Sequence, residues 1–175
     1  MGTAHEDKDT IDKHWMSSRI SEDHQKLDRI FASLESTLRA MAEQEPIEVQ
    51  DPDLLTDARD DLSFALEEML EHFGIEEEAV FVFIRDTLPE FTKALAALER
   101  GHEMMCQQTS RLRMMVAAAR SGNAPLDIPL ALDLVGQTTL LLSTHNRQEV
   151  KLFYEAFQRL DSEGRERLIT AINSH

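Results

Sequence analysis

The sequence has 175 residues, 42% hydrophobic and 29% charged, with a formal net charge of −15 and a pI near 4.8. Because a chain with this negative charge repels nucleic-acid phosphates and anionic lipids, we expect neither a nucleic-acid nor a membrane partner. Gly and Pro are few, with 6 and 5 copies, and good helix formers dominate the rest, so an all-α fold is predicted.

Two features of the sequence bear on where the protein works. The single cysteine, Cys106, cannot form an intrachain disulfide, which favours a reducing environment. The N-terminus is acidic and polar, unlike a secretory signal peptide, and no apolar run approaches the roughly 18 residues of a membrane span. We therefore expect a cytoplasmic location.

The chain begins with a polar stretch, residues 1–16, that is expected to form an N-terminal arm. A long helix is predicted next, from about residue 17 to about residue 43, because apolar residues recur there at spacings of three and four. The residues expected on its buried face are Ile20, Leu27, Ile30, Phe31, Leu34, Leu38 and Met41.

Capping signals divide the remainder into three further long helices and a short one. Asp51 followed by Pro52 predicts a helix start, and this helix is expected to reach about residue 86. Thr87 and Glu90 have the spacing of a capping box for the next helix, which is expected to end before Gly122. The last long helix is predicted over about 127–160, and a tail helix over about 162–172.

Four long amphipathic helices with short connections predict an antiparallel four-helix bundle in up-down-up-down order. We expect one domain over residues 1–175, with the arm at 1–16, the bundle at 17–160 and the tail helix within 161–175.

Each long helix carries one histidine in its apolar stripe, and these four are His24, His72, His102 and His145. His24 lies 19 residues before the helix end expected at residue 43, and His72 lies 21 residues after the start expected at residue 51. The other connected pairs match as closely, and at a rise of about 1.5 Å per residue the mismatches amount to a few ångströms. The four imidazoles are therefore expected in one layer of the bundle.

Two of these histidines are followed four residues later by a glutamate on the same helix face, Glu76 after His72 and Glu149 after His145. Burying four imidazoles and two carboxylates is costly unless they are paired or hold a cation. A hydrogen-bonded polar layer is one interpretation, and a metal site is the one that we favour.

The ligand set suits two six-coordinate ions better than one tetrahedral zinc. Nitrogen ligands argue against calcium and magnesium, and the lack of clustered thiols argues against zinc ribbons and iron–sulfur clusters. Two imidazoles, one oxygen from each shared glutamate and an oxo or hydroxo bridge leave one open position per ion. Iron is the best match, with manganese or zinc as substitutes. A ferritin-like site is disfavoured, because Glu99–His102 is the sole Glu-x-x-His pair among these histidines.

Other residues close in sequence to these histidines are expected to have supporting roles or to face solvent. Cys106, one turn after His102, is expected to face the interior, either as a small apolar residue or as a thiol beside the metal ligands. Gly101 is expected to allow a close approach between helices. Glu71, Glu77 and Glu78 are expected to form a solvated face.

The pattern of one His, then HxxxE, then one His, then HxxxE resembles the hemerythrin-like family, also called the HHE cation-binding domain. The segments EHFGIEEEAVF and ERGHEMM are similar to the family as well, and the match extends over about residues 17–160. The resemblance implies a four-helix bundle with a non-haem, oxo-bridged di-iron centre. It also implies that His24 and His72 bind one iron, that His102 and His145 bind the other, and that Glu76 and Glu149 bridge them.

Two positions differ from the oxygen-carrying members of the family. Cys106 stands where the carriers have a further histidine, and Val150 stands where they have an aspartate, whose role Glu149 takes. The set of four His and two Glu is more similar to di-iron proteins linked to nitrosative stress and iron–sulfur repair. Those proteins carry an N-terminal cysteine-bearing segment that has no counterpart in this sequence.

Three functions are compatible with this site. The first is binding of, or reaction with, a small oxidant (O2, NO or peroxide) in sensing or stress defence, which rests on the open position at each ion. The second is iron storage, donation or iron-availability sensing without oxidant chemistry. The third is a structural or partner-binding bundle with a vestigial site.

Overall fold

The structure is a computed structural model that describes the backbone of residues 3–43 and 51–173 and the side chains of residues 22, 24–43 and 51–172. Its elements are α1 (Thr3–Ala42), α2 (Pro52–Ile75), the π-helical turn η1 (Glu76–Val80), α3 (Phe81–Thr87), the 3-10 turn η2 (Pro89–Phe91), α4 (Thr92–Arg120), α5 (Ile128–Arg159) and α6 (Ser162–Asn173). The part of the chain so described contains no β-strand, so the predicted all-α class is confirmed.

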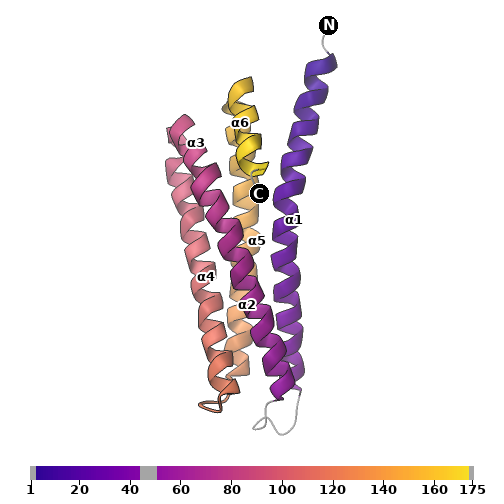
Figure 1. Cartoon of the computed structure of the whole chain (residues 1–175), viewed down its shortest axis with the longest axis vertical. Helices are drawn as coiled ribbons and strands as arrows, with labels where there is room; N and C mark the ends of the chain where they lie inside the picture. Colours follow the sequence, from indigo (N-terminus) through magenta and orange to yellow (C-terminus); the bar gives the residue numbers. More distant parts are fainter. Residues whose placement is uncertain (1–2, 44–50, 174–175) are drawn as a thin grey trace.

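The long helices lie side by side as a bundle, with α6 against one end (Figure 1). Helix α1 contacts α2 and α5, and α4 contacts the same two helices, so α1 and α4 occupy opposite corners of the bundle. Helix α6 packs on η1 and α3. Each long helix therefore contributes one face to a shared interior.

Caps explain where two of the long helices begin and where one ends, and those of Asp51 and Gly122 were predicted from the sequence. Asp51 caps α2 by accepting a hydrogen bond from the backbone N–H of Asp53 at 2.8 Å, and Pro52 fills the first helical position. Asp127 caps α5 through the N–H of Leu130 at 3.0 Å. Gly122, just after α4, has a φ of 70°, the left-handed conformation that closes helices.

Two boundaries differ from the sequence expectations. Helix α1 begins at Thr3 rather than near residue 17, so most of the expected arm is helical and continues the first helix. No Gly or Pro interrupts residues 3–16, so once the helix has formed nothing stops its extension. The capping box of Thr87 and Glu90 does not form, because Leu88 precedes η2 without a side-chain cap and Glu90 binds Arg159 at 3.0 Å instead.

The predicted helix over 51–86 is interrupted by the turn η1. Here the N–H of Phe81 bonds to the carbonyl of Glu76, the five-residue spacing that defines a π-helix. The turn begins at Glu76, one of the expected metal ligands, so it lies beside the candidate site.

Within the described residues, most of the buried apolar side chains fall into two clusters rather than one. The first contains Leu27, Ile30, Phe31, Leu34, Leu38, Met41, Leu55, Ala58, Leu62, Ala65, Met69, Phe73, Met105, Leu112, Val116, Leu126, Ile128, Ala131, Val135 and Leu142. The second contains Val80, Phe81, Ile84, Phe91, Leu95, Leu98, Leu152, Phe153, Ala156, Phe157, Leu160, Leu168 and Ile172. Along α4 and α5 the clusters are separated at His102 and His145, so a buried polar layer divides the apolar interior.

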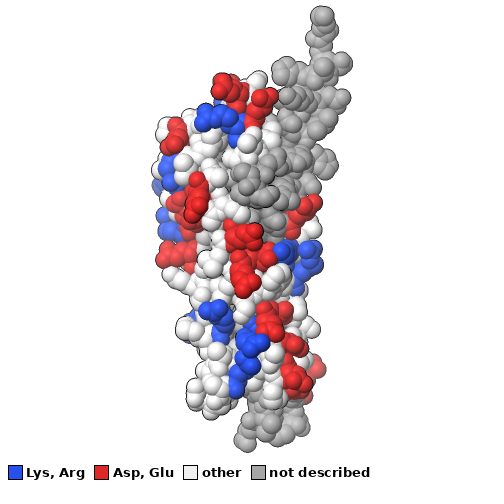
Figure 2. Space-filling view, viewed as in Figure 1, with Lys and Arg blue, Asp and Glu red and all other residues white. Residues whose placement is uncertain are grey.

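Six of the seven residues predicted for the buried face of the first helix are in the first cluster, while the side chain of Ile20 lies outside the described residues. Carboxylates and cationic side chains both appear on the face of the bundle drawn in Figure 2.

A search of the described residues finds no helix with the length and apolar character of a membrane span.

Candidate metal centre

The four expected histidines come from the four long helices and meet in the polar layer. His24, His102 and His145 are buried, with exposed fractions of 4%, 2% and 3%, and His72 is partly buried. The rings form two pairs, with centroids 4.9 Å apart for His24 and His72 and 4.5 Å apart for His102 and His145. The structure thus groups the imidazoles two by two.

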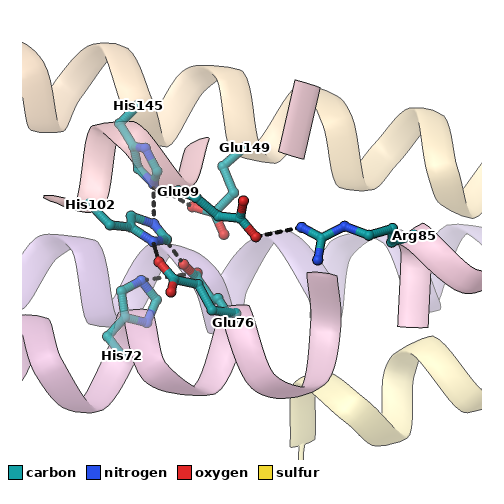
Figure 3. Close-up of polar contacts among 8 residues, drawn as sticks. His72, Glu76, Arg85, Glu99, His102, His145 and Glu149 are labelled. Carbon is teal, nitrogen blue, oxygen red and sulfur yellow. Dashed lines mark hydrogen bonds and ion pairs between the residues drawn. The ribbon is translucent and has the colours of Figure 1, made fainter. Parts of the chain in front are cut away.

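The two expected glutamates lie between these pairs, and each carboxylate approaches one ring of each pair. Glu76 places Oε1 3.1 Å from Nε2 of His72 and Oε2 3.3 Å from Nε2 of His102 (Figure 3). Glu149 places Oε2 3.0 Å from Nε2 of His24 and 3.8 Å from Nε2 of His145. Both carboxylates are buried, so all four imidazoles direct Nε2 toward acceptor oxygens inside the bundle.

The donor atoms form two groups compact enough to hold a cation. One group is His24, His72, Glu76 and Glu149, and the other is Glu76, His102 and His145, with the chosen atoms of each group within 4.8 Å of one another. Glu76 is common to both groups, whereas Glu149 is in the first only. The structure therefore brings all six expected residues together, with Glu76 as the member that the two groups share.

The spacing of the donors suits six-coordinate ions. Neighbouring ligands of an octahedral ion with bonds of about 2.1 Å are about 3.0 Å apart. The Nε2 atoms of His102 and His145 are 3.0 Å apart, and the nearest imidazole–carboxylate distances in the site are 3.0, 3.1 and 3.3 Å. Imidazole and carboxylate are also the donors that iron, manganese and zinc accept. The residues present fit a pair of such ions.

A family comparison agrees with this geometry. The model of the hemerythrin HHE cation-binding domain matches residues 16–157, which includes all six candidate ligands. The chain belongs to the hemerythrin HHE cation-binding family. No curated protein and no solved structure matches it significantly.

Two histidines of this hemerythrin-like site are held in the neutral form that binds metals. Burial lowers the pKa of His102 to about 4 and that of His145 to about 3, against the partial opposition of the charge on Glu149. For Glu149, burial raises the pKa, but contacts with Glu76 and His24 lower it by more. Near neutral pH His102 and His145 are thus neutral and Glu149 is charged, which are the protonation states that metal ligation requires.

Glu77 also belongs to the hemerythrin-like site, although the sequence analysis placed it on a solvated face. Its Oε1 lies 2.7 Å from Nδ1 of His102, the ring nitrogen opposite the one that faces Glu76. The signal that could have indicated this contact is the spacing from Phe73, because Glu77 follows that buried residue by four positions and therefore lies on the same side of the helix. The expectation was wrong in missing this contact, although the side chain of Glu77 is still 40% exposed.

Aromatic rings and one glycine fix the imidazoles of α4 and α5. Phe73 stacks on His102 with ring centroids 3.9 Å apart and planes 4° apart, and Phe81 lies 5.7 Å away at 16°. A Cβ at Gly101 would lie 3.0 Å from Nδ1 of His145. The expectation that Gly101 permits a close helix approach therefore has a specific partner, the imidazole of His145.

Cys106 is partly buried and lies beside the first apolar cluster. Burial raises the pKa of its thiol, and the charge of Glu77 raises it further. Among the described residues, the groups able to hold a metal do not include Cys106. Its role beside the metal ligands stays a prediction.

Two open pockets reach the hemerythrin-like site from opposite faces of the bundle. One, of about 550 Å³, lies between α1 and α5 and is lined by His24, Asp28, Asn146 and Tyr154, among others. The other, of about 610 Å³, lies between α2 and α4 and is lined by residues that include His102, Glu77 and Cys106. Each pocket touches one histidine of a different pair, so each half of the layer has its own approach from the surface.

Proposed function

We propose that this protein is a non-haem di-iron protein that binds or reacts with a small oxidant such as O2, NO or peroxide. The observation that carries the proposal is the sharing of Glu76 between two groups of donors, one completed by His24, His72 and Glu149 and the other by His102 and His145. A carboxylate shared in this way suits two ions held side by side. The proposal takes the helices in up-down-up-down order, which brings one histidine from each to a common level.

The chain's own residues would hold the irons and keep water from surrounding them. His24 and His72 would bind one ion, His102 and His145 the other, and Glu76 and Glu149 would bridge the two. When bound, an iron pair supplies open coordination positions and electrons for a small oxidant. The apolar clusters on either side of the layer limit hydration, and the two pockets admit molecules of small size.

The mixed nitrogen and oxygen donors favour iron, although manganese and zinc accept the same ligands. We propose that His72 is needed for the first ion, since its Nε2 approaches Oε1 of Glu76 at 3.1 Å. The neutral state of His102 and His145 near pH 7 supports loading without prior loss of their protons.

The test combines metal analysis with optical spectroscopy of the iron-loaded chain. We expect about two irons per chain and a visible charge-transfer absorption that changes on addition of azide or NO. His72→Ala should lose at least one iron, whereas Leu70→Ala, an exposed residue of the same helix, should retain both. Fewer than one iron per chain under iron-replete conditions, or an absorption indifferent to azide and NO, contradicts the proposal.

A second candidate function is iron storage, donation or iron-availability sensing. The observation in its favour is that His24 and His102 each line a pocket open to the surface, so iron could leave either half of the layer. This function predicts iron that a chelator removes quickly and no spectral response to azide or NO. A titration of the iron-loaded chain with azide or NO therefore distinguishes the two candidate functions.

A further inference from the structure

The imidazole of His102 is contacted at both of its ring nitrogens. Nε2 faces the candidate metal layer, 3.3 Å from Oε2 of Glu76 and 3.0 Å from Nε2 of His145. Nδ1 faces the opposite way and lies 2.7 Å from Oε1 of Glu77. Two consecutive glutamates thus approach one ring from its two sides, and both belong to the π-helical turn η1.

The contact with Glu77 favours the tautomer of His102 that carries its proton on Nδ1. An ionised carboxylate can only accept a hydrogen bond, so the shorter of the two carboxylate contacts, 2.7 Å to Glu77 against 3.3 Å to Glu76, is a hydrogen bond when Nδ1 of His102 carries the proton. The neutral ring then has its lone pair on Nε2, directed into the layer. A carboxylate behind a metal-binding histidine fixes the tautomer and the ring orientation, and it makes the opposite nitrogen a stronger donor to the metal.

The surroundings of Glu77 leave its carboxylate available for this contact. Arg85 pairs with Glu99, the neighbouring carboxylate on α4, as Figure 3 shows. The side chain of Glu77 is 40% exposed, whereas that of His102 is 3% exposed. Glu77 therefore reaches a buried ring from the pocket between α2 and α4 without being buried itself.

We propose that Glu77 is a positioning residue that holds His102 with Nδ1 protonated and Nε2 directed at the metal, so that it strengthens the half of the site formed by His102 and His145. The inference rests on the proposed metal site, since Glu77 acts through His102 and binds no ion. It adds a seventh residue to the six that the sequence pattern indicates. Its chemistry requires a hydrogen-bond acceptor at this position and benefits from a negative charge.

The test compares Glu77→Ala and Glu77→Gln with Glu78→Gln, which removes the same charge from the next, exposed residue of η1. In the iron-loaded chain, release of iron to a chelator should be about 10- to 100-fold faster in Glu77→Ala than in the wild type. Glu77→Gln, which keeps an acceptor without the charge, should be intermediate, and Glu78→Gln should match the wild type. The inference is overturned if either Glu77 variant releases iron at the wild-type rate, or if Glu78→Gln releases iron faster than the wild type.

A second measurement is independent of iron. In the metal-free full-length chain, nitrogen NMR of His102 should show the proton on Nδ1, and this preference should be lost in Glu77→Ala but kept in Glu78→Gln. A proton on Nε2 in the wild type, or an unchanged tautomer in Glu77→Ala, overturns the inference. If the wild type binds no iron, the proposed function fails, whereas equal iron release by all variants of a chain that binds two irons defeats the role of Glu77 alone.

Discussion

The backbone of Gly101 faces the imidazole of His145 so closely that a Cβ at this position would lie 3.0 Å from Nδ1 of that ring. Real Cβ atoms essentially never come nearer than this, so an added methyl group requires the ring to move. Because Nε2 of His145 is 3.0 Å from Nε2 of His102, a displaced ring opens the second group of donors. Because Gly101 on α4 has no side chain, the imidazole of His145 on α5 can occupy this position.

Gly101→Ala should therefore weaken metal binding without unfolding the helix. Alanine is the better helix former by about 1 kcal/mol, which offsets part of the cost of crowding. We expect roughly tenfold weaker binding of one ion, measured by metal titration of the metal-free chain. Gly136→Ala is the matched control, because a Cβ at Gly136 meets nothing within 4 Å. Equal affinities in the two variants would show that His145 tolerates the methyl group.

Removal of metal should lower the stability of the fold. A ligand that binds only the folded chain stabilises it by about 2.7 kcal/mol when its free concentration is 100 times the Kd. For a chain of this size that corresponds to a rise in melting temperature of roughly 5 to 11 °C. Differential scanning calorimetry with added iron and with a chelator measures the difference. Identical melting temperatures would argue against both the di-iron proposal and iron-availability sensing.

The metal-free protein should lose stability as the pH falls from about 6.5 to about 4. Burial lowers the pKa of folded His102 from 6.5 to about 4, whereas the unfolded chain takes up its proton near pH 6.5. Above pH 6.5 both states are neutral at His102 and the effect vanishes. Between pH 6.5 and pH 4 only the unfolded state binds the proton. By pH 4 this lowers the free energy of unfolding by about 3 kcal/mol.

Urea unfolding of the metal-free chain at pH 7, 5 and 4 measures this loss, and His102→Asn is the control. The variant lacks the titrating ring, so its stability should fall less steeply over the same range, whatever its stability at pH 7. His145, with a pKa lowered to about 3, adds a loss of the same sign in both proteins. Parallel pH profiles for the wild type and the variant would mean that His102 is not held neutral.

Helix periodicity made the layer of histidines predictable. A helix rises by a fixed step per residue, so for two helices expected to run antiparallel with a short connection, counting residues relates the height of His24 to that of His72. The same regularity put Glu76 and Glu149 on the faces of their preceding histidines. The all-α class followed from composition, and Asp51 and Gly122 marked helix ends through local chemistry.

The contact of Glu77 with His102 was not predicted, because Glu77 was expected on a solvated face with Glu71 and Glu78. The segment EEEAV contains residues compatible with an ordinary α-helix, so the sequence did not predict the π-helical turn that it forms. Counting at 3.6 residues per turn puts Glu77 one turn after the buried Phe73, at the edge of the interior face, so helical periodicity is compatible with this contact. The helical start at Thr3 was missed for another reason, since a polar stretch without breakers can extend a helix that is nucleated elsewhere.

Cys106 should prove a poorly reactive thiol that metal binding does not need. Burial raises the pKa of its thiol, and the nearby charge of Glu77 raises it further, so little of the reactive thiolate forms near neutral pH. Alkylation by iodoacetamide at pH 8 should be more than about tenfold slower in the folded chain than in urea, because the pKa and the reduced access act together. Glu77→Gln should accelerate it by removing the second cause. Cys106→Ala should bind iron as the wild type does, whereas loss of an iron from that variant would place the sulfur among the ligands.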